Sequence, residues 1–362
     1  MSQHMCVSSQ KLPANILKSI PEIQSINLER NSIKSIHPQA FSGARRLMVL
    51  NLYGNQINKL PLKGFRDLVN LRFLMLGQNQ ISTINPEMLV GLRNLSDLDM
   101  PVNSITALPD NCFKPLVSLK VLDLALNRIQ KLSPKSFEGL RELMFLNLDN
   151  NSLKTIPRGV FRPLVSLQTL VLDNNLLGTP SASMLEGLSA LKELYLRNNE
   201  IQKLPRNFFK HTLGLTQLAL SGNRLVALDG TSHVAGAPLA ALRDVFLQDN
   251  PWRCNCGVAS LVRWISQSTA RSSTLGVLRC AAPPALQGKP FQSLVADNLK
   301  CKQGRPWNTL LYIYTLVKRV HSSVTCSTTT LDTSSICLNC FNSYIKSVCE
   351  TYFDVTPRGL FS

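Results

Sequence analysis

Four cysteines in the last third of the chain have a spacing that could support chemistry. Cys254, Cys256, Cys280 and Cys301 follow the pattern C-x-C-x23-C-x20-C. Four such thiols can form two disulfides or hold one zinc ion. Ordinary zinc sites bring their ligands in closely spaced pairs, and here only the first two cysteines are close. The spacing therefore favours disulfides over zinc.

The sequence contains no catalytic or cofactor-binding pattern. Its five histidines form no H-x-x-x-H pair, and nucleophile elbows, phosphate-binding glycine loops and nucleotide fingerprints are absent. Cys337 and Cys340 form one isolated C-x-x-C pair, which is weak evidence for metal or redox chemistry. Asp97 and Asp99 could do acid–base work only inside a closed pocket. We predict a protein that is not an enzyme and uses no metal, cofactor or small-molecule substrate.

A sequence repeat of 24 residues runs through most of the chain. The structure formed by this repeat must position the cysteines and acids named above. Asparagine recurs nine times at this interval, a tenth copy follows 27 residues later, and an apolar anchor keeps the same phase. The asparagines are Asn31, Asn55, Asn79, Asn103, Asn127, Asn151, Asn175, Asn199, Asn223 and Asn250; the anchors are Phe41, Phe65, Leu89, Phe113, Phe137, Phe161, Leu185 and Phe209. Such regularity predicts a tandem repeat.

Each repeat can form one coil of a solenoid. Its L-x-L segment is a short strand with inward leucines, and the asparagine amide can satisfy backbone groups of adjacent coils. One coil cannot bury its own leucines, so the coils must stack, at roughly 4.8 Å per strand. The pattern resembles the leucine-rich-repeat superfamily, in its extracellular 24-residue class, over about residues 17–302. The resemblance implies an α/β solenoid, a horseshoe of about ten coils with one short parallel strand each.

Both ends of an open solenoid need a cover. The segment beginning Pro251-Trp252 and containing the four cysteines is similar to the family's cysteine-rich C-terminal cap. The resemblance implies the bonds Cys254–Cys280 and Cys256–Cys301. Disulfides form in oxidising compartments, so we expect a secreted, matrix or cell-surface protein.

The amino end fits this location less well. Cys6 resembles the last cysteine of the family's N-terminal cap, but its usual partners and a signal peptide are absent from the sequence. We expect that the amino end is truncated; the alternative is an unpaired Cys6. The predicted organisation is a cap remnant at 1–16, repeats at 17–250, the C-terminal cap at 251–302 and a disordered tail at 303–362.

Charge is distributed unevenly over the predicted solenoid. The 362 residues carry a net charge of +17, which favours polyanionic partners, and no run reaches the roughly 20 apolar residues of a membrane helix. The positions flanking the strand leucines should face the concave surface; they hold nine acids and two bases, Arg30 and Arg197. The acids are Glu29, Asp97, Asp99, Asp123, Asp149, Asp173, Glu193, Asp244 and Asp249.

An apolar group lies among these acids, and exposed aromatic residues on a rigid sheet are typical binding anchors. It comprises Val49, Tyr53, Phe73, Met75, Val102, Val121 and Phe145. We expect a cationic protein or peptide to bind here. The alternative is that the acids serve only solubility. The candidate ligand-binding residues are Tyr53, Phe73, Met75, Asp97, Asp99, Asp123, Phe145 and Asp149.

Three further predictions concern the outer surface and the core. The basic exterior and the C-terminal cap, with seven bases against Asp297, could bind a sulfated glycosaminoglycan; the alternative is ordinary solvated charge. Asn94-Leu-Ser and Asn150-Asn-Ser are glycosylation sequons. Cys112 is expected to be a buried structural thiol.

The resemblance is closest to the group containing platelet glycoprotein V, chondroadherin and the carboxypeptidase N regulatory subunit. It implies a non-enzymatic adhesion or matrix protein, with collagen among the possible ligands. The alternatives are a non-catalytic subunit of a secreted enzyme and an innate-immune recognition ectodomain. The acidic concave face argues against nucleic acid at that surface.

Overall fold

The computed structural model describes residues 2–4, 10–228, 242–259, 261–262, 277–294 and 299. The chain divides into two compact units, Met1–Cys301 and Lys302–Ser362. The second unit lies outside the described residues, and so do Cys6, Cys301 and the predicted tail at 303–362. The account below concerns the described part of the first unit.

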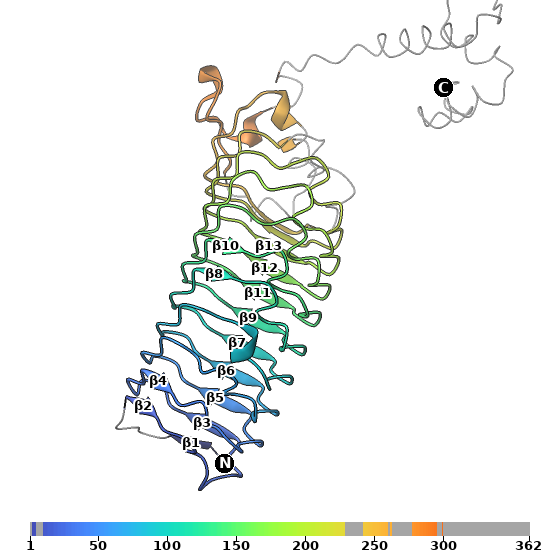
Figure 1. Cartoon of the computed structure of the whole chain (residues 1–362). Helices are drawn as coiled ribbons and strands as arrows, with labels where there is room; N and C mark the ends of the chain where they lie inside the picture. Colours follow the sequence, from blue (N-terminus) through green and yellow to red (C-terminus); the bar gives the residue numbers. More distant parts are fainter. Residues whose placement is uncertain are drawn as a thin grey trace, which may run out of the picture. The chain divides into compact units, whose positions relative to one another are not determined.

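Eleven three-residue strands form one parallel sheet, in which each strand pairs with the next (Figure 1). They are β1 (Ser2–His4), β3 (Ser25–Asn27), β5 (Val49–Asn51), β6 (Phe73–Met75), β7 (Asp97–Asp99), β9 (Val121–Asp123), β11 (Phe145–Asn147), β12 (Thr169–Val171), β13 (Glu193–Tyr195), β14 (Gln217–Ala219) and β15 (Asp244–Phe246). The predicted parallel-strand solenoid is confirmed. The sheet begins at β1, ahead of the first predicted repeat, because Ser2–His4 pairs in parallel with β3.

Shorter elements lie on the other side of the coils (Figure 1). The two-residue strands β2 (Lys11–Leu12) and β4 (Ser35–Ile36) pair in parallel, and so do β8 (Ala107–Leu108) and β10 (Lys131–Leu132). One 3₁₀ turn, η1 (Pro86–Met88), lies between β6 and β7 in the chain, with the Asn85 side chain accepting from the Met88 N–H at its start. Three more belong to the cap: η4 (Cys256–Val258), η5 (Pro284–Leu286) and η6 (Phe291–Ser293).

The core lies between the sheet and the anchor residues. From β3 to β15 the central residue of each sheet strand is fully buried, a leucine in eight strands and Ile26 or Val245 in the other two, while most residues beside it are partly exposed. On the far side the anchor rings stack from coil to coil, with ring centroids 6.3 Å apart for Phe113 and Phe137 and 5.8 Å apart for Phe137 and Phe161. Each coil therefore buries its leucines against its neighbours, as the repeat pattern predicts.

The repeated asparagines join the coils by hydrogen bonds. Asn127 accepts from the Ile105 backbone N–H at 3.1 Å through Oδ1, and its Nδ2 donates to the carbonyls of Met100 at 3.0 Å and Leu124 at 3.1 Å. The same cross-coil arrangement recurs from Asn55 to Asn250. The predicted role of the amide is thus present in the structure, and these asparagines are buried.

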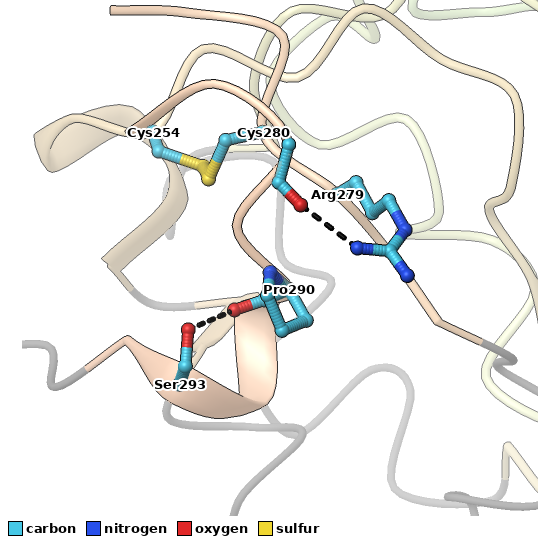
Figure 2. The surroundings of a disulfide bond; sticks show 6 residues. Cys254, Arg279, Cys280, Pro290 and Ser293 are labelled. Atoms are coloured by element: carbon cyan, nitrogen blue, oxygen red, sulfur yellow. Dashed lines mark hydrogen bonds between the residues drawn. A yellow bond between two sulfur atoms is a disulfide. The ribbon is translucent and has the colours of Figure 1, made fainter. Parts of the chain in front are cut away.

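The C-terminal cap closes over the last coil through a buried tryptophan. Trp252 packs edge-on against Phe291, with ring centroids 6.1 Å apart, and its Nε1 donates to the Leu247 carbonyl at 3.2 Å. Beside it lies the disulfide Cys254–Cys280 (Figure 2). This bond confirms a disulfide-bonded cap and is incompatible with a zinc site using all four thiols.

The second predicted bond is only partly visible. Cys256 is disulfide-bonded, and its Sγ lies 3.7 Å from the carbonyl oxygen of Leu299, two residues before Cys301. Cys301 itself lies outside the described residues, so the pairing Cys256–Cys301 stays a prediction.

Replacing one of the buried asparagines that join the coils should destabilise the solenoid strongly. Asn127→Ala leaves a buried N–H and at least one buried carbonyl without partners, so we expect the free energy of unfolding to fall by about 3 kcal/mol. Urea unfolding followed by circular dichroism measures this. Asn58→Ala is the control, since Asn58 is exposed and should change stability by less than about 0.5 kcal/mol. If the two substitutions lowered the free energy of unfolding equally, the proposed role of the buried asparagines would be contradicted.

Candidate functional site

The solvent-exposed side of the eleven-stranded sheet carries the predicted binding residues. We call it the strand face: the first and third residues of each strand, together with the two loop positions just before each asparagine. Parallel pairing without register shifts sets equivalent residues beside one another on successive strands. A short sequence motif is thereby converted into continuous rows of side chains about 4.8 Å apart.

Two carboxylates lie side by side on the strand face. Asp99 on β7 is in register with Asp123 on β9. Burial raises the pKa of Asp99 to about 6, and the charge of Asp123 adds to this. Burial also raises the pKa of Asp123, although that carboxylate accepts from the Ala125 N–H at 2.9 Å. Among the described residues, neither acid has a cationic partner in an ion pair.

Apolar side chains flank this acid pair. Along the first strand position, Phe73, Asp97, Val121 and Phe145 follow one another in register on β6, β7, β9 and β11. Phe73 is the most open of them, with 40% of its surface exposed. Along the third position, Met75 is the neighbour of Asp99. The structure therefore gathers six of the eight candidate residues on four consecutive strands.

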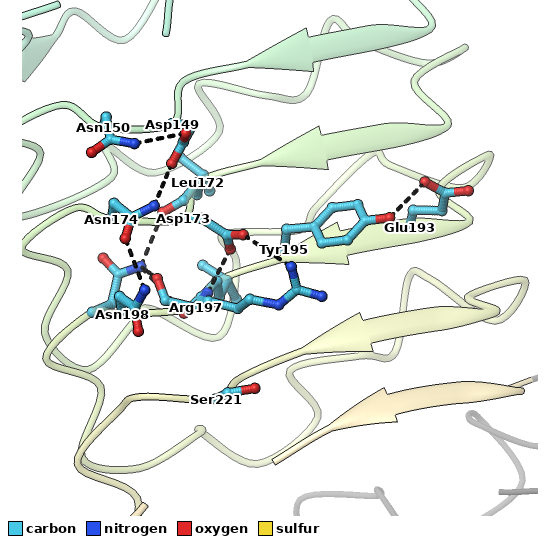
Figure 3. A network of polar contacts seen from close by, with 12 residues as sticks. Asp149, Asn150, Leu172, Asp173, Asn174, Glu193, Tyr195, Arg197, Asn198 and Ser221 are labelled. Atoms are coloured by element: carbon cyan, nitrogen blue, oxygen red, sulfur yellow. Dashed lines mark hydrogen bonds and ion pairs between the residues drawn. The ribbon is translucent and has the colours of Figure 1, made fainter. Parts of the chain in front are cut away.

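The other two candidates are partly engaged within the protein. The Tyr53 ring lies against the backbone of Gly77, where an added Cβ would be 2.9 Å from Tyr53 Cδ2. The two oxygens of Asp149 accept from the side-chain amides of Asn150 and Asn174, each at 2.8 Å (Figure 3). Asn174 accepts in turn from Asn198. Asp149 is thus fixed in position, and its charge still contributes to the raised pKa of Asp123.

Two exposed apolar residues occupy an unfavourable backbone conformation beside the acid pair. Val102 and Leu126 have φ values of 55° and 54° and are 41% and 51% exposed. Coil stacking imposes this geometry, since their N–H groups donate to the carbonyls of Ala125 at 3.0 Å and Asp149 at 2.9 Å. Most other copies of this position hold asparagine or glycine, which tolerate positive φ. An exposed side chain held at such a cost suggests a role outside folding.

The carboxyl-terminal part of the strand face contains residues that the sequence analysis missed. Tyr195 on β13 and Phe246 on β15 both contact the Arg197 guanidinium, whose Cζ lies 5.3 Å and 4.8 Å from the two ring centroids. Arg197 also lies 3.7 Å from a carboxylate oxygen of Asp173. Tyr195 donates to Glu193 at 3.1 Å (Figure 3).

A complete survey of the third strand position would have found both aromatic residues. Their contacts matter for the distribution of charge, because Arg197 compensates the acids around it. Burial raises the pKa of Asp173 to about 6 even with Arg197 beside it. Unlike Asp173, the carboxylates of Asp99 and Asp123 have no base in an ion pair among the described residues.

The remaining predicted sites are also located. Asn94 and Asn150 are both exposed, and their glycosylation stays a prediction. Cys112 is a buried free thiol whose pKa is raised to about 12, mainly by burial, which suits a structural residue. Of the seven cap bases, only Arg253, Arg279 and Lys289 lie among the described residues. In that part of the chain no group of three or more His, Cys, Asp or Glu side chains could hold a metal ion.

Removing the Asp99 charge should stabilise the folded protein in a pH-dependent way. A carboxyl pKa raised from 3.8 to about 6 on folding costs stability above pH 6, and this cost disappears as pH falls below 4. We expect Asp99→Asn to gain about 1 kcal/mol at pH 7.5, after discounting for solvent screening, and much less at pH 4.5. Urea unfolding at both values measures this.

Asp97→Asn is the matched control, because it removes the same charge from the same strand at a position in register with Phe73 and Val121. A pH-independent effect of Asp99→Asn, or an equal effect of the control, would argue against a strained acid pair.

Comparisons with known proteins agree with this architecture. The family model "Leucine rich repeat" matches overlapping segments from residue 8 to residue 251, with one segment at 45–105 and another at 118–177. The model "Leucine rich repeat C-terminal domain" matches residues 278–302. No helix among the described residues has the length and apolar character needed to cross a membrane.

Curated relatives match over short segments. The human platelet glycoprotein Ib beta chain is 42% identical over 62 residues, 17% of this chain and 30% of that protein. Human trophoblast glycoprotein-like is 40% identical over 57 residues, 16% of this chain and 15% of that protein. This chain therefore covers less than a third of either relative.

A solved structure matches much more of the chain. A chain from the octameric complex of latrophilin 3, Unc5D and FLRT2 (LRR) superposes with a TM-score of 0.62 and 25% identity, covering 81% of this chain and 94% of that one. Because the repeat model matches well over half of the sequence and the cap model follows it, this chain belongs to the leucine-rich-repeat family and carries the family's C-terminal domain.

Proposed function

We propose that this chain is a non-enzymatic extracellular recognition protein that binds a cationic protein segment on its strand face. The observation that carries the proposal is the uncompensated pair Asp99 and Asp123, flanked by the exposed side chains of Phe73, Val102 and Leu126. The disulfide-bonded cap supports an extracellular location. The FLRT2-containing complex supports a protein partner, since it assembles a leucine-rich-repeat protein with latrophilin 3 and Unc5D.

Binding at this face would use charge and apolar contact in different ways. A lysine or arginine between Asp99 and Asp123 would relieve their mutual repulsion, and the attraction would speed association. Phe73 and Phe145 would provide the buried contacts that slow dissociation. Asp97 and Asp149 would extend the negative potential on either side. Tyr53 and Met75 would border the contact.

Several partner classes fit this chemistry and remain proposals. A matrix or adhesion protein, collagen included, is the leading class because the family resemblance points to it. A secreted enzyme that uses this chain as a non-catalytic subunit is a second class, and a ligand of an innate-immune ectodomain is a third. Phosphate backbones are repelled by the acids of β7 and β9, so nucleic acid is not expected there.

Charge reversal on the strand face tests the proposal. Immobilised wild-type protein and the variant Asp99→Lys with Asp123→Lys are exposed to extracellular fluid and to fibrillar collagen. Proteins retained by the wild type should be lost from the variant, and their association rate should fall about tenfold with a flatter salt dependence. Surface plasmon resonance on each recovered protein measures this.

The control variant is Glu87→Lys with Glu200→Lys. It changes charge equally but lies in exposed ion pairs with Lys63 and Arg224, away from the strand face. If both variants retain the same proteins with the same kinetics, binding at the strand face is excluded.

The strained apolar positions allow binding and stability to be separated. Replacing Leu126 with asparagine relieves the positive-φ strain, so we expect the free energy of unfolding to rise by about 1 kcal/mol. The same change removes an exposed contact and should weaken retention of the partner. Leu62→Asn, at an exposed leucine outside the positive-φ positions, should change neither. A Leu126→Asn variant that is less stable, or that binds as well as wild type, would contradict this role.

A further inference from the structure

A second surface, formed by the loops that follow the apolar anchors, carries exposed bases in six consecutive coils, and one base in each coil follows a regular alternation. These bases alternate between two loop positions three residues apart. They are Arg45, Arg66, Arg93, Lys114, Arg141 and Arg162. Because equivalent positions recur at about the strand spacing, the bases form a staggered row along the stack.

A hollow of about 650 Å³ lies within this row. Its lining residues are Arg66, Val69, Val90, Gly91, Arg93, Asn94 and Pro115. A glycine brings the two arginine-bearing loops together: Gly91 has φ +100°, and a Cβ added to it would lie 2.5 Å from the Arg66 backbone. Any other residue at position 91 would separate the loops.

The lining combines positive charge with apolar surface. Arg66 and Arg93 supply two guanidinium groups, and no acid is among the lining residues. Asp67 lies 3.8 Å from the Arg66 Nε, but it faces the preceding coil, where it accepts from the Gly43 N–H at 2.8 Å. Val69 is 42% exposed, so apolar surface is open to a ligand.

The same loop geometry recurs every 48 residues with different charge. A Cβ added to Gly139 would lie 3.3 Å from the Lys114 backbone, and one added to Gly187 would lie 2.9 Å from the Arg162 backbone. In these copies an acid, Glu138 or Glu186, stands where Val90 lies in the first. The hollow between Arg66 and Arg93 is therefore the copy with two bases and no acid at these positions.

We infer that this hollow binds a sulfated sugar unit of a glycosaminoglycan chain. The forked guanidinium groups of Arg66 and Arg93 match sulfate and carboxylate oxygens, and the C–H face of a pyranose ring can pack on the two valines. Arg45 and Lys114 continue the row on either side, which suits a linear polyanion better than a small anion. This site is separate from the strand face and gives the predicted glycosaminoglycan surface a defined location.

Binding of a heparin hexasaccharide by titration calorimetry tests this inference. The inference requires Asn94 to carry no glycan, since a glycan on this lining residue would cover the hollow. All proteins therefore carry Ser96→Ala, which removes the sequon and keeps the Asn94 side chain. Arg66→Gln with Arg93→Gln should raise the Kd at least tenfold. The control Arg128→Gln with Lys131→Gln, at two exposed bases outside the row, should change the Kd less than twofold. Thermal unfolding confirms that each variant is folded.

A second variant tests the geometry without removing a base. Val90→Glu copies the natural acid of the next hollow and should weaken hexasaccharide binding about as much as the double arginine substitution. Equal losses in the arginine pair and its control would show non-specific attraction and overturn the inference, as would undetectable binding to the starting protein. Equal affinity for desulfated heparin, for phosphatidylserine vesicles or for duplex DNA would overturn the choice of a sulfated sugar.

Discussion

A single coil of this protein cannot satisfy its own backbone at the turn after the strand, and the buried asparagine solves this across coils. Asn127 pairs with backbone groups of the coil before it, so no coil is complete without a neighbour. The leucines also depend on neighbouring coils, because the inward leucines of one coil are buried by those of the next. Stability is therefore distributed along the stack, and the buried Trp252 with the disulfide of the cap protects the last coil.

The stacking of coils through these asparagines also restricts which residues fit on the strand face. Positive φ occurs at the residue before each of the ten asparagines, which favours glycine and asparagine there. Valine and leucine at positions 102 and 126 depart from this preference beside the acid pair of β7 and β9. Two positions where local preference and sequence disagree, 102 and 126, thus lie in the same coils as Asp99 and Asp123, whose carboxyl pKa values are raised by burial.

The fold could be predicted from the sequence because it depends on a strict period: one asparagine and one anchor fix the register of every coil. The disulfide Cys254–Cys280 followed from family resemblance. The Tyr195–Arg197–Phe246 contact was not predicted, since it depends on the Arg197 side chain reaching an aromatic ring 49 residues further along the chain. The hollow at Arg66 was not predicted either, because it depends on how closely two loops approach at Gly91.

The glycines at 91, 139 and 187 show that the building unit on the loop side is a pair of coils. Gain or loss of coils by twos would leave the alternation of bases intact and lengthen or shorten the row. Gain or loss of one coil would set two loops of the same kind against each other, so that a glycine would no longer face the backbone of a base in the preceding coil. Length variation in this lineage should therefore proceed in even steps.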